Sequence, residues 1–409
     1  MEKGTCCTIL MVGDGRRFKA EDATLTDPSS QDVCRAGDEA NWHRLPLLTA
    51  LTALAALMHD LGKATLAFQE RLLEAGASER NHYRHEWVSV RLFQAFVGQE
   101  DDSAWLRRLA DGALNDHDDA AFEDLWLDHG GGRLLRDGLD TDEEKDGPLG
   151  ANNPFRALPP LAQALAWLVL THHRLPCKPV RSDHDAGKDG RLRMRPFGAR
   201  PRFINPDDLD GLLAQVYADW NEPRERRMRA EIETYWHFPH GLPVHGPAWR
   251  KQAAHYAKKL LILSDAGSTS SVLDDPFVMH VSRMCLMLAD HHYSRHGLDE
   301  QNQPVAARRL YLQPEAKLAA NTTYTQERRS VLNQTLDEHL LGVQAHATLI
   351  TRSLPTLATS LPALQNHRGL KKRSTQASFQ WQNKATDLAT AVRQRSVSQG
   401  AFIVNMAST

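Results

Sequence analysis

Residues 56–72 read ALMHDLGKATLAFQERL and contain the end of one helical pattern and the start of another. Upstream, 47–61 keeps Leu, Ala and Met at the i, i+3, i+4 spacing of a buried helix, and downstream 66–73 repeats the same period. Between them stand His59 and Asp60, two residue types that bind metals. The stretch therefore predicts a helical core with metal-binding side chains at one end of it.

Helical periodicity dominates the rest of the chain as well. Hydrophobic residues make up 41% of the 409 residues and charged ones 24%, as is typical of a soluble globular chain with two or three structural units. We predict a mostly α fold whose core is a helical bundle. Further helices are predicted at 87–96, 161–172, 253–263 and 277–293.

Composition argues against several classes of protein. A net charge of −2 argues against a wholly basic nucleic-acid binder. The longest apolar stretch, 45–58, falls short of the ~20 residues that a bilayer requires, so no membrane span is predicted. The N-terminus lacks the apolar core of a signal peptide, and five cysteines without a CxxC pair indicate neither a disulfide framework nor a zinc finger. We expect a reduced, cytoplasmic protein.

The near-neutral total conceals three charged segments. Residues 100–148 carry a net charge of −11 and are interpreted as a solvated surface, with docking of a partner as the alternative. Residues 178–202 carry +5 in a loop rich in Gly and Pro, and 366–395 carry +6. A mobile solvated loop and a linker surface are the plain interpretations of the two basic segments. Contact with a DNA backbone is the functional one.

These shifts in composition divide the chain into three parts. Residues 1–40 are expected to form an irregular lead-in, 41–300 a helical domain, and 301–409 a C-terminal segment with a Pro-interrupted run at 349–364. Near its end, 401–406 (AFIVNM) has the β-branched and aromatic content of a buried strand.

Candidate metal ligands recur at the ends of the predicted helices. Adjacent side chains on a helix point about 100° apart, so His59 can bind one metal while Asp60 bridges to a second. Lys63 follows where the helix stops, and its ammonium can contact a phosphate there. The other candidates at helix ends are His85, His172, His173 and Asp290.

Each candidate also has an ordinary structural interpretation. An isolated His-Asp or His-His pair is common, and a histidine at a helix start, such as His85, is often a surface or capping residue. Asp290 can belong to a local hydrogen-bond network. Burying such groups without partners is costly, so their joint occurrence at the ends of apolar helices favours metal coordination.

Eight stretches carry a family resemblance: MVGDGRRFKAED (11–22), DEANWHRLP (38–46), ALMHDLGKATLAFQERL (56–72), YRHEWVSVRLFQAFVG (83–98), LVLTHHRLP (168–176), MCLMLADHHYS (284–294), SFQWQNKATDLA (378–389) and IVNMAST (403–409). Together they resemble the HD phosphohydrolase superfamily. Within it, the likeness is to the HD nuclease domain of the CRISPR-associated nuclease-helicase of type I interference systems, subtype F.

The resemblance implies a site for two divalent transition-metal ions. Mn, Fe, Co or Ni suit its imidazoles better than Mg, which prefers oxygen ligands. In the family a further histidine upstream usually completes one metal. The sole upstream histidine here, His43, would lie about 24 Å from His59 along a continuous helix, so it is not assigned. The implied ligands are His59, Asp60, His85, His172, His173 and Asp290, with Asp60 bridging.

The family's nuclease domain precedes a RecA-like helicase lobe. Residues 378–382 (SFQWQ) resemble the glutamine motif before that lobe, and 403–409 resemble its first strand. No G-x-x-x-x-G-K-[ST] motif occurs, so no ATP site is expected in this chain. A nuclease-domain fragment of a longer protein is the simplest expectation.

The resemblance further implies a metal-dependent deoxyribonuclease, endo- or exonucleolytic, that cleaves single-stranded DNA during CRISPR interference and antiviral defence. Its implied partners are the RNA-guided interference complex and anti-CRISPR inhibitor proteins. The expected catalytic residues are His59, Asp60 and Lys63, and the expected substrate-binding residues are Lys63, Arg174, Lys188, Arg191 and Arg193.

Two alternatives stay open at this point. An HD phosphohydrolase acting on nucleotides would share the metal ligands. A non-catalytic module that only docks on the interference complex would need no metal.

Overall fold

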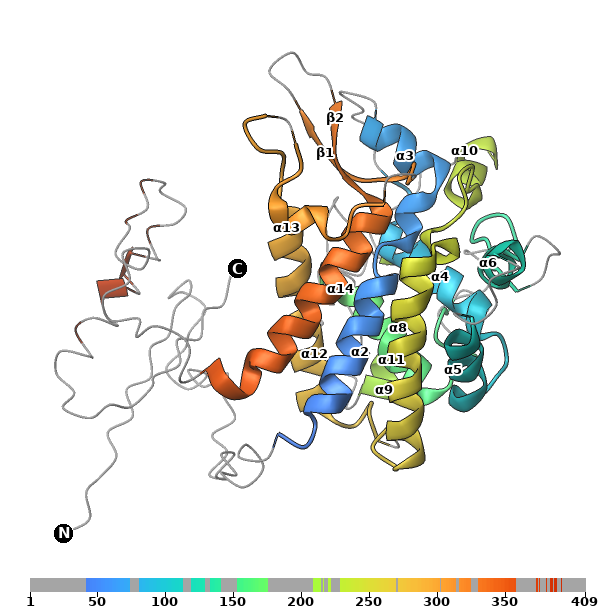
Figure 1. Cartoon of the computed structure of the whole chain (residues 1–409). Coiled ribbons are helices and arrows are strands. Elements are labelled where there is room, and N and C mark those ends of the chain that lie inside the picture. The colour runs from blue at the N-terminus through green and yellow to red at the C-terminus, as the bar shows by residue number, and fades with distance from the viewer. Residues whose placement is uncertain are drawn as a thin grey trace, which may run out of the picture. The chain divides into compact units, whose positions relative to one another are not determined.

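The computed structural model is mostly α-helical, which confirms the predicted fold class (Figure 1). It describes residues 42–357, without 74–80, 113–118, 129–132, 141–152, 176–208, 215, 217–219, 222–228, 270, 302, 314–315 and 325–329, together with a few residues between 373 and 391.

The elements of the described part follow in chain order. The α-helices are α2 (Leu45–Met58), α3 (Leu66–Leu73), α4 (His85–Val97), α5 (Asp102–Asp111), α6 (Asp119–Leu127), α8 (Pro160–Thr171), α9 (Leu209–Leu213), α10 (Arg229–Glu233), α11 (Pro247–Asp265), α12 (Pro276–Ser294), α13 (Ala306–Arg309) and α14 (Leu336–Ser353). Short 3-10 helices are η2 (Leu61–Ala64), η4 (Thr234–Trp236), η5 (Pro243–His245) and η6 (Leu354–Thr356), and the strands are β1 (Ala319–Tyr324) and β2 (Ser330–Thr335).

Every helix expected from the sequence overlaps a helix of the structure. The predicted segment 66–73 coincides with α3, and the predictions for α2, α4, α8 and α12 differ from the structure by no more than three residues at either end. The largest difference is at α11, which begins six residues before the predicted start. Apolar periodicity finds these helices because each packs one or more faces into the core.

The central helix is α2. Pro46 stands in its first turn, where the missing N–H of proline has no helical partner to lose. Every residue from Leu47 to Met58 is buried, because α14, α12, α11 and α8 pack around it. The apolar stretch continues to Ala64 and is then long and apolar enough to cross a membrane. However, 89% of its most apolar window lies inside the fold, as in the core helix of a globular domain.

Two long helices, α12 and α14, pack against α2 and against each other. They approach closely at Gly342 of α14, where a Cβ atom would lie 2.1 Å from the ring of Tyr293 on α12. A buried ion pair joins Arg308 to Glu338 beside them, and the Tyr293 hydroxyl donates to Glu338 at 3.1 Å. The pair of helices is therefore held in one register by packing and by polar contacts.

A small antiparallel hairpin of β1 and β2 lies near one end of α2 and α14 (Figure 1). Gln69 of α3 binds its edge, since the side chain accepts from Ala319 N–H at 2.8 Å and donates to Ala319 C=O at 2.9 Å. The same amide donates to Lys63 C=O at 2.6 Å, so Gln69 links the hairpin to η2, the turn that directly follows His59 and Asp60.

Several acidic side chains of the segment 100–148 are structural rather than part of a solvated face. Asp102 accepts from the N–H groups of Leu161 and Ala162 at the start of α8. Asp137 is fully buried and forms a two-pronged ion pair with Arg91 at 2.8 and 2.7 Å. The excess of acids in this segment is thus partly used to cap and join helices.

Residues 42–355 form one compact unit, and 1–41 with 356–409 form a second. α14 belongs to the first unit, although the sequence analysis assigns it to the C-terminal segment 301–409. The predicted lead-in (1–40), the basic segment 178–202 and the predicted strand at 401–406 lie outside the described residues.

Candidate metal centre

The centre begins where α2 ends. His59 directly follows α2 and Asp60 precedes η2, so both side chains lie at one end of the core. At Gly62 of η2 a Cβ atom would lie 2.1 Å from the carbonyl oxygen of His85, and the Gly62 N–H donates to Ser89 Oγ at 2.8 Å. Only glycine permits this close approach, which holds the His-Asp turn against the start of α4.

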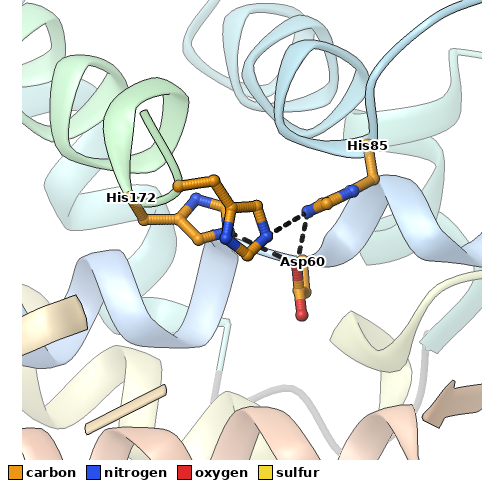
Figure 2. A group of neighbouring side chains, drawn as sticks. Asp60, His85 and His172 are labelled. Carbon is orange, nitrogen blue, oxygen red and sulfur yellow. Dashed lines mark hydrogen bonds and ion pairs between the residues drawn. The ribbon is translucent and has the colours of Figure 1, made fainter. Parts of the chain in front are cut away.

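A first group of ligands faces one oxygen of Asp60. From Asp60 Oδ1, Nε2 of His85 lies at 3.1 Å and Nε2 of His172 at 3.7 Å. Nε2 of His173 lies 3.1 Å from that of His85. Figure 2 shows the rings of His85 and His172 converging on Asp60. The ligand atoms of all four residues lie within 4.8 Å of one another, so a single ion can contact them together.

A second group faces the other oxygen. From Asp60 Oδ2, Nε2 of His59 lies at 3.3 Å and Nε2 of His339 at 3.2 Å. Oδ1 of Asp290 lies 3.9 Å from the first of these nitrogens and 3.4 Å from the second. His59, Asp290 and His339 also bring their ligand atoms within 4.8 Å of one another. The Asp60 carboxylate therefore lies between two clusters and presents one oxygen to each.

Backbone contacts hold two of the histidines in the tautomer that a metal needs. Nδ1 of His59 donates to Ala56 C=O at 2.8 Å, and Nδ1 of His172 donates to Val169 C=O at 2.6 Å. A carbonyl oxygen can only accept, so the proton must be on Nδ1 in both rings. In the neutral ring Nε2 then carries the lone pair, and in both histidines Nε2 faces Asp60.

Gln334 of β2 orients the ring of His339 in the same way. Its amide Nε2 donates to the carbonyls of Tyr293 and His296 at 2.8 and 2.9 Å, which fixes the direction of the amide. Its Oε1 then accepts from Nδ1 of His339 at 2.9 Å, so in the neutral ring of this histidine Nε2 carries the lone pair.

Buried atoms without hydrogen-bond partners gather at this point. They are Nε2 of His59, His172 and His339, and Oδ1 of Asp60. An unsatisfied buried polar atom costs about 1–3 kcal/mol, so such a concentration needs a compensating partner. All four atoms are electron-pair donors directed into the two clusters. The residues therefore fit two divalent cations.

Both carboxylates are in the charged form that binds cations. Burial alone would raise the pKa of Asp60, but its contacts with His59, Lys63 and His85 outweigh burial and hold this pKa well below its usual value. For Asp290, burial would also raise the pKa, and its contacts with His339 and His59 outweigh burial and lower it. Burial lowers the pKa of His85, which leaves that ring neutral and able to coordinate.

Glu86, which the sequence analysis does not single out, stands behind His85. Its side chain is fully buried, its Oε2 lies 3.6 Å from Nδ1 of His85, and its Oε1 pairs with Arg84. Histidine ligands of metals commonly direct their second N–H toward a carboxylate, which orients the ring and raises its basicity. Glu86 is placed to do this for His85.

Lys63 lies inside the cluster rather than at an exposed rim. Its Nζ contacts Asp60 Oδ2 at 2.8 Å and Ala320 C=O at 3.4 Å, and the residue is 8% exposed. The ammonium therefore compensates the charge of Asp60, and its contact with a phosphate stays a prediction.

Comparisons with known proteins identify the family of the chain. The family described as "Cas3, HD domain" matches residues 35–273. The chain belongs to the Cas3 HD-domain family. Two curated relatives are named "CRISPR-associated nuclease/helicase Cas3 subtype I-F/YPEST". The one from Pseudomonas aeruginosa is 38% identical over 98% of this chain and 32% of its own length, and the one from Pectobacterium atrosepticum 36% identical over 98% and 33%. The chain thus spans about a third of the length of these two relatives.

The Cas3 HD match ends before two members of the second cluster. Asp290 and His339 lie beyond residue 273, although the alignments with the two Cas3 relatives extend over nearly the whole chain. Sequence analysis found Asp290 but missed His339. Its local features, a position in the first turn of α14 directly after Asp337 and Glu338, are shared by histidines on ordinary helices.

The structure brings together all six histidines and aspartates that the resemblance to this family implied as ligands: His59, Asp60, His85, His172, His173 and Asp290. His43 is exposed just before α2, at the end of that helix opposite to His59. The further histidine near the metal ligands is instead His339, which belongs to the second cluster. Arg174 is half-buried, with its guanidinium 5.0 Å from the centre of the Trp220 ring. The other predicted substrate-binding residues, Lys188, Arg191 and Arg193, lie outside the described part of the chain.

Proposed function

We propose that this chain is a metal-dependent nuclease domain that hydrolyses phosphodiester bonds of single-stranded DNA. The observation that carries the proposal is the Asp60 carboxylate, whose two oxygens face two separate clusters of metal ligands. A phosphate bound across two cations held in this way has its charge neutralised on both sides.

Each residue of the centre has a defined part in the proposal. Asp60 would contribute to both metal positions. His85, His172 and His173 would hold one ion with it, and His59, Asp290 and His339 would hold the other. Five imidazoles beside the two carboxylates favour Mn, Fe, Co or Ni over Mg. When bound, two such ions would supply an activated water and electrostatic stabilisation for in-line displacement at phosphorus.

The chain's own residues would position the substrate. His173 is the exposed member of the first group, and so marks the side from which a phosphate would enter. Lys63, already beside Asp60, would keep that carboxylate aligned and add positive charge near the phosphate. Arg174, Lys188, Arg191 and Arg193 follow His173 in sequence, and we propose that they bind the DNA backbone.

The biological setting is also part of the proposal. The two relatives are named as CRISPR-associated nuclease/helicases, and on that basis we infer that this chain acts in the cytoplasm with an RNA-guided interference complex to degrade foreign DNA. Anti-CRISPR inhibitor proteins are candidate antagonists.

The test is cleavage of single-stranded DNA by the purified chain with Mn²⁺. We expect cleavage that EDTA stops and that Asp60→Ala abolishes, while Asp140→Ala, at a partly exposed ion pair with Arg136, retains it. Hydrolysis of dNTPs without DNA cleavage would instead support the nucleotide phosphohydrolase. Less than one bound metal per chain together with no cleavage would support a docking module.

A further inference from the structure

A third cluster of histidines lies outside the centre just described. Within the described residues, the ligand atoms of His292, His296 and His346 lie within 4.8 Å of one another, and no ligand of the Asp60 centre belongs to this group. His292 is in the last turn of α12, His296 follows two residues after that helix ends, and His346 is on α14. Two histidines four residues apart at the end of one helix, with a third from the neighbouring helix, can bind a transition metal through three imidazoles.

The three rings lie close together, and within the described residues their cluster contains no carboxylate. Nε2 of His292 lies 3.3 Å from Nε2 of His296, so at most one of these nitrogens can donate to the other. The ring of His346 lies with its centre 4.6 Å from that of His292. In the described part of the chain the His346 ring has no hydrogen-bond partner. One cation can contact all three ligand atoms, because they lie within 4.8 Å of one another.

We propose that His292, His296 and His346 bind one divalent transition-metal ion, with Zn²⁺ or Co²⁺ as the expected class, separately from the Asp60 centre. Three neutral imidazoles without a carboxylate suit borderline transition metals and do not suit Mg²⁺ or Ca²⁺. All three residues are half-buried, which leaves room for water or another ligand at the fourth position of a tetrahedral ion.

Nearby positive charge does not prevent binding. Arg308 is neutralised by its buried ion pair with Glu338. Arg295 is exposed, so water and salt screen its charge.

The site would hold together the two helices that carry Asp290 and His339. His346 lies two turns after His339 on α14, and His292 lies two residues after Asp290 on α12. Between the two centres stands Tyr293, whose ring centre lies 6.1 Å from that of His339 and 5.7 Å from that of His346. An ion here would bridge α12 and α14 and stabilise their packing.

The experiment measures zinc bound per chain and the zinc-induced rise in melting temperature, in the full chain after removal of metals with EDTA. We expect His292→Ala and His346→Ala each to bind one zinc equivalent fewer, or to bind it at least about tenfold more weakly, and to lose that part of the rise in melting temperature. The matched control is His280→Ala, an exposed histidine on the same helix outside the three His/Asp clusters.

The substitution His346→Gln keeps a polar side chain at this position. The melting temperature of this variant without metal checks that the fold is retained. A double variant His59→Ala/His85→Ala, which lacks a ligand at each metal position of the Asp60 centre, should still bind zinc through the third cluster. Equal zinc stoichiometry and affinity in His346→Gln, His292→Ala and His280→Ala would overturn the proposal, and so would loss of all tight zinc binding in the double variant.

Discussion

At the scale of single residues, the centre depends on one carboxylate, whose two oxygens face different clusters of ligands. Asp60 has no freedom to turn, because Lys63 contacts Oδ2 at 2.8 Å while Nε2 of His85 lies 3.1 Å from Oδ1. It is 1% exposed, so few water molecules compete for its oxygens. A buried carboxylate with fixed direction is the group that can bridge two cations at a constant separation.

His339 is predicted to be a ligand as necessary as the histidines that the sequence revealed. Its replacement in His339→Ala removes the nitrogen that lies 3.2 Å from Asp60 and 3.4 Å from Asp290. We expect metal at the second position to bind at least about ten- to a hundredfold more weakly, and DNA cleavage to fall accordingly. Metal titration monitors the first effect, with His255→Ala, an exposed histidine on α11, as the control. Unchanged affinity in His339→Ala would exclude it as a ligand.

Glu86→Gln tests whether the carboxylate behind His85 matters. The side chains have nearly equal size, so packing is retained while the negative charge 3.6 Å from His85 Nδ1 is lost. We expect about tenfold weaker metal binding at the first position, since partners of ligating histidines have effects of this size. Glu70→Gln, at an exposed position on α3, should leave the affinity unchanged. Equal affinities in the two variants would limit Glu86 to its pairing with Arg84.

At the scale of the elements, ligands converge because several elements end or begin at one place. α2 and α8 end at His59 and His172, α4 begins at His85, α12 ends shortly after Asp290 and α14 begins just before His339. Helix ends leave backbone groups without helical partners. Here Ser89 Oγ accepts from the Gly62 N–H, and the Gln334 amide donates to the carbonyls of Tyr293 and His296. The centre is therefore a product of helix packing rather than of one loop.

Gly62→Ala should disturb this convergence. The added Cβ would lie 2.1 Å from His85 C=O and 2.9 Å from Val88 Cβ, so η2 and α4 must move apart. We expect a loss of about 1–3 kcal/mol in the free energy of unfolding, as for other overpacked sites, with weaker metal binding through the shift of His85. Urea unfolding checks the stability. Gly297→Ala, whose nearest new neighbour would lie 3.8 Å away, should be nearly neutral.

The buried ion pair between α4 and the 134–140 turn gives a second prediction at this scale. Asp137→Ala leaves Arg91 buried without its charged partner, and should destabilise the fold by about 3–5 kcal/mol. Asp140→Ala, three residues further along the chain, breaks a partly exposed pair with Arg136 and should cost no more than about 1 kcal/mol. Similar unfolding midpoints for the two variants would contradict this difference.

Sequence patterns predicted the helices far better than they predicted the hairpin or the last ligand. A helix such as α12 buries a periodic set of apolar side chains, which the sequence displays directly. β1 and β2 are polar strands, AANTTY and SVLNQT, that owe their pairing to Gln69 and neighbouring helices. His339 joins the centre by contacts between residues far apart in sequence, and no local pattern in its surroundings distinguishes it from a histidine on an ordinary helix.

At the scale of the whole molecule, the compact unit extends well past residue 300. α14 lies along α2, and its side chains Leu336, Leu340, Leu341 and Val343 are buried in the shared core. At roughly 1.5–3 kcal/mol for each buried side chain, these four contribute about as much as the 5–15 kcal/mol by which a typical domain is stable. The unit of folding therefore includes α14, together with the metal ligand that it carries.

Truncation distinguishes this unit from a shorter domain that ends at residue 300. We expect a chain shortened after residue 300 to lose cooperative unfolding, because α2 would expose the face that α14 covers, and to lose the second metal position with His339. A chain shortened after residue 357 removes no residue of α14 or of either metal cluster, and should keep its melting temperature and metal stoichiometry within error. Calorimetry with elemental analysis of both chains decides the matter. A cooperative transition and two bound metals in the shorter chain would show that α14 is dispensable, and would reassign the second metal position to residues before 300.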